Sequence, residues 1–367
     1  MFYYSTFVHM YGKESLKHFH GENKLFLNSF HEGRGSSVSV CEIKPFDSAI
    51  QPICMRIKEI LYDLPLLYQQ AINEIRFRVG RPVTLHTPTR VDLLEHNGKP
   101  VITEKVDIEE SYRRICDYSL YSHQEEIRNG YITIQGGHRV GISGTAVLQQ
   151  DKIATLREIS SLNIRIARQI YGAADKLLQR IGPNIVQGLL IAGPPSCGKT
   201  TLLRDLVRQL ANGVDGQLKK VAVIDERGEL AGVYCGIPQH DLGICTDILD
   251  HYPKGEGILQ AVRSLSPQFI VCDELGGQAD LEGVQQGLHS GTVTISTVHA
   301  GNLQDLLRKK QGKALLTSQA FGYLAIMDAV HLGEITEIHK VRDLLDQIDR
   351  QYSTGFHDDA VRLHGVL

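Results

Sequence analysis

The sequence lacks the long apolar runs and paired cysteines that mark membrane and secreted proteins. No apolar stretch approaches the roughly 18 residues that a membrane-spanning helix requires. Charged residues and histidines between positions 13 and 20 interrupt any apolar signal segment near the N-terminus. The seven cysteines are scattered and never spaced as C-x-x-C, which supports neither a disulfide framework nor a zinc site. These absences predict a soluble, cytoplasmic protein with reduced thiols and no transmembrane segment of its own.

The sequence also lacks a strong net charge. The formal net charge is −3, which argues against a generally basic nucleic-acid-binding protein but leaves room for a local basic patch. Hydrophobic residues make up 42% of the chain, enough for ordinary globular cores. The length of 367 residues predicts about two domains of roughly 150 residues each.

Composition and periodicity divide the chain into four segments. The region before Met55 contains a glycine- and serine-rich stretch at 33–37 and has no sustained periodicity. The first convincing helix begins near Met55, and this methionine is an alternative translation start that would leave the preceding segment outside the native protein. The predicted segments are a flexible N-terminal extension (1–54), a smaller α/β domain (55–182), a second α/β domain (183–335) and a helical or flexible C-terminal tail (336–367).

The smaller domain shows a mixed pattern of strands, helices and tight turns. We predict a strand at 75–79 and a pair of helices across 108–129. Gly136-Gly137 indicates a hairpin turn between two apolar strands, and Asp151-Lys152 closes a second hairpin.

The second domain alternates short apolar runs with stretches of helical periodicity. The predicted strands are 188–192, 221–225, 268–272 and 293–297. Near-continuous apolar strands separated by helices predict a parallel sheet covered on both faces. Ligands of such sheets bind at the carboxyl ends of the strands, where the polar residues discussed below are found.

A phosphate-binding loop follows the first of these strands. The pattern G-x-x-x-x-G-K-T is matched at every specified position, and an amphipathic helix comes directly after it. In this motif backbone N–H groups and a helix N-terminus face the phosphates, the lysine meets their charge and the threonine hydroxyl binds Mg²⁺. The predicted nucleotide-binding residues are Gly193, Pro194, Pro195, Ser196, Cys197, Gly198, Lys199, Thr200 and Thr201.

Two neighbouring carboxylates follow the strand 268–272. We assign Asp273, together with Thr200, to the metal and Glu274 to the base that polarises the attacking water. The alternative is that both carboxylates only cap the next helix. Glu226 ends the neighbouring strand and is an alternative water-positioning residue, or shares the task with Glu274.

Other polar residues at these strand ends have less specific patterns. His299 follows the fourth strand, where a neutral imidazole can sense the terminal phosphate by hydrogen bonding. Arg227 contacts phosphate or pairs with a carboxylate, and the sequence leaves both roles open. In multimeric ATPases an arginine supplied by a neighbouring subunit stabilises the transferring phosphoryl group. The candidates here are Arg139, Arg165, Arg168 and Arg263, each of which has the alternative of a solvated or salt-bridged side chain.

Four segments of the sequence resemble the stage III sporulation protein AA family. They read GYITIQGGHRVG, SLNIRIAR, VAVIDER and RSLSP and occupy residues 130–141, 161–168, 221–227 and 263–267. The family consists of ATPases of endospore-forming bacteria that are similar to the hexameric motor ATPases of type II and type IV secretion. The resemblance covers about 56–335.

This resemblance implies a RecA-like P-loop core with an N-terminal domain packed beside it in a homo-oligomeric ring, a hexamer in the similar motors. It implies ATP and Mg²⁺ as cofactors. It also implies a cytoplasmic position in the mother cell, peripheral at the outer forespore membrane. There the protein would act with the membrane-associated stage III proteins of the same complex in a secretion-like channel.

The family's functional residues match this sequence with one departure. The phosphate loop and the Asp273-Glu274 pair carry over directly, Glu226 falls near the acidic box of the secretion ATPases, and His299 falls at their histidine box. Members of the family usually have arginine within a G-x-R-T-D segment, where this chain has Cys245. If that arginine touches phosphate, this chain uses another residue or hydrolyses more slowly.

Three rival interpretations remain open at this stage. A phosphotransferase would need an arginine-rich lid, and no lid insertion is visible after residue 200. A nucleotide-gated module binding single-stranded nucleic acid would use the arginines of 139–168, but few aromatic residues interleave with them, so nucleic acid is not the expected partner. A scaffold that binds ATP without hydrolysing it is suggested by Cys245.

Overall fold

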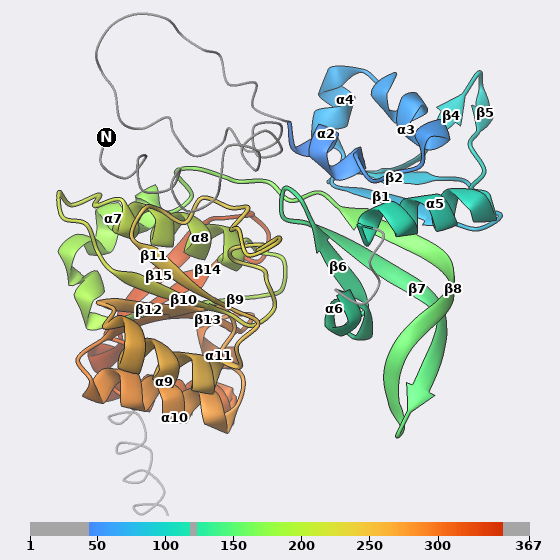
Figure 1. Cartoon of the computed structure of the whole chain (residues 1–367). Helices are drawn as coiled ribbons and strands as arrows, with labels where there is room; N and C mark the ends of the chain where they lie inside the picture. Colours follow the sequence, from blue (N-terminus) through green and yellow to red (C-terminus); the bar gives the residue numbers. More distant parts are fainter. Residues whose placement is uncertain (1–43, 118–122, 348–367) are drawn as a thin grey trace, which may run out of the picture.

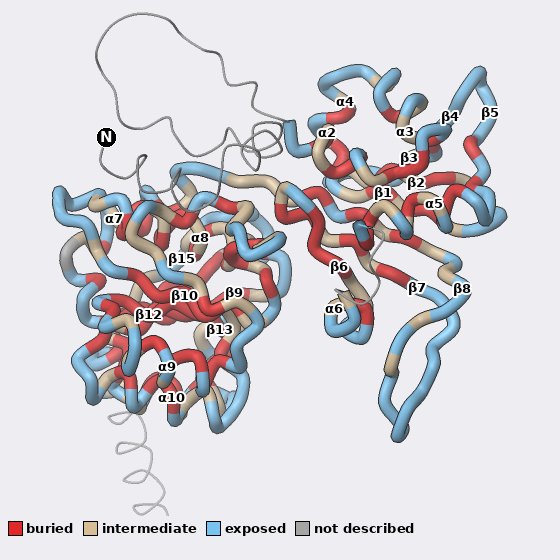
Figure 2. Tube along the Cα trace, in the orientation of Figure 1, coloured by how far each residue is buried: buried red, intermediate tan, exposed pale blue. Residues whose placement is uncertain are grey.

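The chain forms two α/β domains that lie side by side in Figure 1. The computed structural model describes residues 44–117 and 123–347. Each domain is built on its own sheet and has its own apolar core, and Figure 2 shows buried residues concentrated along the strands of both sheets. The predicted order, a smaller α/β domain followed by a parallel-sheet core, is confirmed.

The N-terminal domain contains a six-stranded antiparallel sheet in the order β3-β2-β1-β8-β7-β6. Its strands are β1 (Glu74–Arg78), β2 (Thr84–His86), β3 (Val91–Leu93), β6 (Tyr131–Ile134), β7 (His138–Gln149) and β8 (Lys152–Arg165), while β4 (Glu95–His96) and β5 (Lys99–Pro100) form a separate hairpin. Buried residues alternate along β1, as expected of a sheet with one face in the core. Both predicted hairpins are confirmed, at Gly136-Gly137 and at Gln150-Asp151.

Helices contribute the rest of the N-terminal core. They are α2 (Pro45–Ile50), α3 (Met55–Tyr62), α4 (Leu66–Ala71), α5 (Lys105–Ile115) and α6 (Gln124–Arg128). Ile57 of α3 and Ile108 of α5 are fully buried with Phe77 of β1 in one cluster. Burying such side chains contributes roughly 1.5–3 kcal/mol each.

The N-terminal domain begins before its predicted boundary at residue 55. Helix α2 precedes that position, and Phe46, Ile50 and Ile53 are buried in the same core as Ile57. Apolar residues at this spacing bury one face of a short helix, so residues 45–54 are a folded part of the domain. Residues 1–43 lie outside the described residues, and the predictions about them stay predictions.

The second domain is built on a seven-stranded sheet in the order β11-β10-β12-β13-β9-β14-β15. Its strands are β9 (Leu189–Gly193), β10 (Val221–Asp225), β11 (Thr246–Asp250), β12 (Phe269–Cys272), β13 (Val293–His299), β14 (Tyr323–Met327) and β15 (Ile335–Lys340). All are parallel except β15, which pairs antiparallel with β14. The four predicted strands are confirmed, and every residue of β9, β10 and β12 is buried, as a sheet covered on both faces requires.

Two layers of helices cover this sheet (Figure 1). The helical elements are α7 (Asp175–Ile181), η2 (Gly182–Gln187), α8 (Lys199–Ala211), α9 (Lys254–Leu265), α10 (Gln278–His289), α11 (Leu303–Arg308) and α12 (Lys310–Thr317). Helices α7 and α8 pack into the core of one face, whereas α9 to α12 pack into the core of the other. Across the described ranges, none of the helices has the length and apolar character needed to cross a bilayer.

The two predicted boundaries of the second domain both shift outward. Helix α7 lies before residue 183, yet Leu177 and Ile181 are buried in the core that contains α8, so α7 belongs to the second domain. The linker between the domains is therefore 167–173 rather than 182–184. At the other end, β15 extends the sheet beyond residue 335 and the segment 341–347 is helical, while the rest of the predicted tail, 348–367, lies outside the described residues.

Candidate functional site

The phosphate loop connects the buried strand β9 to helix α8 at the carboxyl edge of the sheet. The loop needs two backbone conformations with positive φ, at Ser196 (+62°) and at Gly198 (+99°). The value at Gly198 suits glycine because a Cβ would be strained there. Helix α8 begins directly at Lys199, so its first backbone N–H groups and the positive end of its dipole face the cavity beyond the loop.

Gly193, the first glycine of the motif, is required for a different reason. A Cβ on Gly193 would lie 2.6 Å from Cys197 Sγ and 3.0 Å from Met327 Cβ, closer than real Cβ contacts. The loop therefore folds back tightly over the end of β9. Cys197 is buried under the loop and packs with the core rather than pointing into the cavity.

Lys199 is held by acceptors on three sides. Its ammonium donates to the carbonyl oxygens of Gly193 at 2.9 Å and Pro194 at 2.7 Å, and it lies 3.0 Å from His299 Nδ1. Burial lowers the pKa of Lys199 from its usual value, because a desolvated ammonium is disfavoured. The partners are neutral, so the side chain gains a strong partner when an anion enters the cavity.

Thr200 and Asp273 lie together at the start of α8. The Thr200 hydroxyl donates to Asp273 Oδ2 at 2.7 Å, and Asp273 Oδ1 accepts from the Thr297 hydroxyl on β13. A hydroxyl beside a carboxylate is a set of hard oxygen donors of the kind that Mg²⁺ prefers. The predicted metal-binding pair is therefore brought together by the fold, and its donor chemistry fits Mg²⁺.

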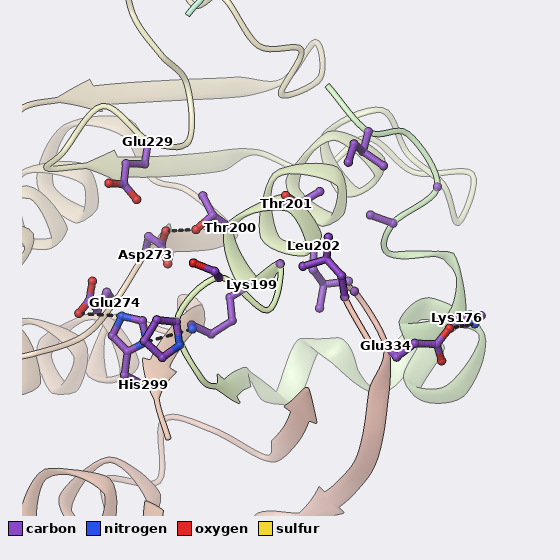
Figure 3. A pocket seen from close by; sticks show the side chains of 18 of the residues that line it. Lys176, Lys199, Thr200, Thr201, Leu202, Glu229, Asp273, Glu274, His299 and Glu334 are labelled. Carbon is purple, nitrogen blue, oxygen red and sulfur yellow. Dashed lines mark hydrogen bonds and ion pairs between the residues drawn. The ribbon is translucent and has the colours of Figure 1, made fainter. Parts of the chain in front are cut away.

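Glu274 and His299 form a chain of contacts that starts at Lys199 (Figure 3). The ammonium is a donor only, so His299 Nδ1 accepts from it and Nε2 carries the proton. His299 Nε2 lies 3.2 Å from Glu274 Oε1, within ion-pair distance of it. Glu274 itself adopts a left-handed backbone with φ of +49°, and its N–H donates to Thr297 Oγ1 at 2.8 Å. Such backbone strain in a non-glycine residue is common at functional sites.

The acidic residue of the neighbouring strand faces a different partner. Glu226 forms an ion pair with Lys254, whose side chain is buried at the N-terminus of α9. Arg227, next to it, pairs with Glu274, with 2.8 Å between NH1 and Oε2. The structure thus places Arg227 on a carboxylate, one of the two roles that the sequence left open.

The phosphate loop, the two carboxylates that follow β12 and the histidine at the end of β13 line one cavity of about 650 Å³. Figure 3 shows Lys199, Thr200, Asp273, Glu274 and His299 converging on it from three elements. Away from the loop, the lining becomes apolar at Ile170 of the linker and Leu332 of the β14–β15 turn, which are both exposed. Glu226 is not part of this lining and borders a small adjoining cavity beside Asp273 and Glu274.

The four candidate arginines occupy different places. Arg165 lines the main cavity and makes only a long contact of 3.6 Å with Glu74. Arg139 faces Glu229 of its own chain, and Arg168 donates to backbone carbonyls around Ile72. Arg263 is exposed on the last turn of α9. Their predicted action on a neighbouring subunit stays a prediction.

Cys245 lies at the opposite end of the sheet from the phosphate loop. It immediately precedes β11, which runs parallel to β10, and its carbonyl accepts from Val221 N at the amino end of that strand. The loop and the carboxylates lie at the carboxyl ends. Cys245 is therefore remote from the phosphate loop of its own chain.

Sequence reasoning missed two parts of the site. Thr297 binds both members of the Asp273-Glu274 pair, and the only signal was a hydroxyl residue in β13 next to the strand that ends at these acids. The turn before β15 was missed because its strands were not predicted. Gly333 N in this turn donates to Cys197 O at 2.9 Å and so supports the phosphate loop from outside the motif.

Comparisons with known proteins are consistent with this geometry. A family model described as "Sporulation stage III, protein AA" matches residues 47–345. Stage III sporulation protein AA of Bacillus subtilis (strain 168) is 38% identical over 289 residues, which covers 77% of this chain and 91% of that protein.

Solved structures show a similar fold at low sequence identity. The Legionella pneumophila ATPase DotB matches with a TM-score of 0.50 and 16% identity over 84% of this chain and 87% of that one. The pilus retraction motor PilT, solved with bound ADP, matches with a TM-score of 0.52 and 13% identity over 80% and 90%. The chain therefore has the fold of these secretion-type ATPases, a RecA-like core preceded by an N-terminal domain.

Proposed function

The chain belongs to the stage III sporulation protein AA family, and from this membership we propose that it is an ATPase that drives movement during endospore formation. The observation that carries the proposal is the convergence of Lys199, Thr200, Asp273, Glu274 and His299 on one cavity. A cationic loop residue faces two acids there, across a space large enough for a nucleotide. This is the arrangement that phosphoryl transfer to water requires.

The triphosphate binds with its β- and γ-phosphates against the loop and the first turn of α8. Backbone N–H groups of 196–201 and the helix dipole stabilise the negative charge. Lys199 exchanges its neutral carbonyl partners for phosphate oxygens, which are stronger acceptors for an ammonium. The exposed apolar side chains of Ile170 and Leu332 cover the far part of the cavity, where the nucleoside would lie.

Hydrolysis consists of one displacement at the γ-phosphorus. A water oxygen forms the new P–O bond, the bond to the oxygen bridging the β- and γ-phosphates breaks, and ADP and phosphate leave. Glu274 takes the water proton, with Glu226 as the second candidate for positioning the water. Thr200 and Asp273 would hold Mg²⁺, which would neutralise charge on the phosphates.

The proposed use of this energy is mechanical. Nucleotide turnover moves the N-terminal domain against the core within a homo-oligomeric ring, a hexamer by analogy with the fold's motors. An arginine from a neighbouring subunit, one of Arg139, Arg165, Arg168 and Arg263, completes the site. We place the protein in the mother cell at the outer forespore membrane, where it powers a secretion-like channel made with other stage III proteins. The family membership and the ATPase fold support this role.

Two substitutions test the ATPase proposal. Lys199→Ala removes the ammonium from the loop, so nucleotide binding is lost. Glu274→Gln keeps the size of the side chain and one accepting oxygen but removes the base, so binding persists while kcat falls by about 10²–10⁴-fold. Binding is measured with a fluorescent ATP analogue and turnover by phosphate release, at several protein concentrations.

The outcomes separate three cases. A well-folded wild-type protein that ignores millimolar Mg-ATP contradicts the whole proposal. Binding without phosphate release at any protein concentration leaves a nucleotide-binding scaffold. Undiminished turnover in Glu274→Gln moves the role of base to Glu226.

A further inference from the structure

The loop that follows β10 is held from outside by the N-terminal domain. Tyr131 Oη of β6 donates to the carbonyl oxygen of Arg227 at 3.1 Å, and the Arg139 guanidinium of β7 donates to the same oxygen. Arg139 also pairs with Glu229 at 2.7 Å, and its guanidinium lies over the Tyr131 ring, 4.2 Å from the ring centre. The N-terminal sheet therefore contacts this loop at two points, the carbonyl oxygen of Arg227 and the side chain of Glu229.

The same loop is held from inside by the core. The buried carboxylate of Asp225 accepts the backbone N–H groups of Glu229, Leu230 and Ala231 at 2.8, 3.1 and 2.8 Å. Arg204 of α8 donates to the carbonyl oxygens of Glu229 and Leu230. These contacts fix residues 229–231 to the core, whereas the contacts with the carbonyl oxygen of Arg227 come from the N-terminal domain, so a displacement of that domain acts on Arg227.

Arg227 contacts both the N-terminal domain and the candidate base Glu274. Its backbone carbonyl is the atom that Tyr131 and Arg139 hold, while its guanidinium binds Glu274 Oε2. His299 binds the other oxygen, Glu274 Oε1. Both carboxylate oxygens are thus oriented, one by the phosphate-loop side of the site and one by a residue whose position depends on the N-terminal domain.

We propose that Arg227 is a positioning residue that couples the placement of the N-terminal domain to the orientation of the Glu274 carboxylate. The inference rests on the proposed ATPase function and specifies how that site is regulated. When the N-terminal domain moves away from the loop, Arg227 withdraws and Glu274 loses one of its two orienting partners. Hydrolysis is then fastest while the domains are engaged.

A contribution to folding stability does not account for the ion pair between Arg227 and Glu274. The side chain of Arg227 is 58% exposed and that of Glu274 is 32% exposed. Ion pairs with this exposure contribute little to folding stability. The effect of the ion pair on the rate of hydrolysis is larger, because it orients Glu274. A displacement of about 1 Å at a reacting group can cost roughly 100-fold in rate.

The first test separates positioning from binding. Arg227→Ala is expected to lower kcat roughly 10- to 100-fold while the dissociation constant for ATP stays within about twofold of wild type. Arg227→Lys keeps a cation of similar reach and restores part of kcat. Arg90→Ala serves as the matched control, since Arg90 is also an exposed arginine in a carboxylate pair but lies in the N-terminal sheet beside Asp92.

The second test asks whether the N-terminal domain acts through Arg227. Arg139→Gln removes the contacts with Arg227 O and Glu229, and Tyr131→Phe removes one hydrogen bond while keeping the ring. Each is expected to lower kcat in the wild-type background and to have little further effect in Arg227→Ala. Such non-additivity is the signature of residues that act through one another.

Each outcome has a defined meaning. If the wild type binds and hydrolyses ATP but Arg227→Ala turns over at the wild-type rate, the coupling role is wrong and the ATPase function stands. Additive losses in Arg139→Gln and Arg227→Ala contradict transmission through Arg227. If the wild type fails to hydrolyse ATP under any condition, the ATPase function fails before the coupling is tested.

Discussion

At the scale of single residues, His299 is the side chain that joins the binding half of the site to its catalytic half. Its Nδ1 accepts from Lys199 and its Nε2 lies 3.2 Å from Glu274 Oε1, so one ring contacts both charged side chains. A nucleotide that draws Lys199 toward its phosphates changes the first contact and, through the ring, affects the second. We therefore expect the imidazole to relay phosphate occupancy to the carboxylate.

Two substitutions of His299 test this bridging role. His299→Leu removes both contacts and leaves Lys199 and Glu274 without this partner, so kcat is expected to fall by roughly 10- to 100-fold. His299→Gln can accept through its oxygen and donate through its nitrogen, so it retains a larger part of the rate. Steady-state phosphate release measures both. Equal losses in the two variants would show that the ring does not act as a hydrogen-bonded bridge.

Single residues of the site differ in how well the sequence predicts them. Lys199, Thr200 and Asp273 were predicted because a motif or a strand end fixes their place, and the fold brings them together. The Thr297 contacts could not be predicted, and the sequence did not identify which carboxylate pairs with Arg227, because both depend on which strands lie next to each other. Strand order is a tertiary property that no local pattern encodes.

At the scale of secondary-structure elements, the β14–β15 hairpin supports the phosphate loop. Its connecting turn places Gly333 against the loop, where its N–H donates to Cys197 O. Beside it, Glu334 pairs with Lys176 of α7 at 2.8 Å across the mouth of the cavity. The β14–β15 hairpin, which is far from the phosphate loop in sequence, thus supports this loop and the edge of the proposed nucleotide site.

A matched pair of glycine substitutions tests this support. Gly333 and Gly291 have φ of +79° and +77°, and a Cβ at either position would meet nothing within 4 Å. Alanine at either position costs roughly 1 kcal/mol of strain and should lower the melting temperature similarly. Only Gly333→Ala disturbs the contact with Cys197, so we expect ATP affinity to fall about five- to tenfold in this variant alone. Equal affinities in both variants would contradict a supporting role for the turn.

Elements were predicted well where burial is complete and poorly elsewhere. The strands β9, β10 and β12 are apolar throughout because helices cover both faces, and this pattern is visible in the sequence. The edge strands β11 and β15 are partly exposed and carry polar residues, so their sequences resemble loops or helices. Strand β14 is fully buried, but a short apolar run of this kind cannot be distinguished from a buried helix by periodicity.

At the scale of the whole molecule, two buried histidines lie where the domains meet. His138 of β7 belongs to the N-terminal domain, and its Nδ1 accepts the backbone N–H of Ala167 at the start of the linker at 2.9 Å. His240 belongs to the core and lies close to Gly137 of the other domain. The predicted boundary at 182–184 missed this junction, because a Gly-Pro pair marks a local turn while the true boundary depends on which core α7 packs into.

Protonation of these histidines opposes the folded state. Burial lowers the pKa of His138 to about 4 and that of His240 to about 3, with nearby Arg168 and Arg204 acting in the same direction. The His138 Nε2 carries the proton and donates to Ser48 Oγ at 2.8 Å, so a second proton on Nδ1 would face the N–H of Ala167. In the unfolded chain a histidine has a pKa of about 6.5. Between these values the unfolded chain binds more protons than the folded one.

The sign of the pH effect follows from this difference. Because the unfolded state takes up the extra protons, stability is fully present above about pH 6.5 and decreases as the pH falls toward the folded values. The limiting slope is about 1.4 kcal/mol per pH unit for each histidine. The melting temperature should therefore drop between about pH 7 and pH 5.5, and His138→Gln should reduce this drop. His289→Gln, at the exposed end of α10, is the control and should keep the full drop. A pH dependence identical in all three proteins would rule out His138 as a source of it.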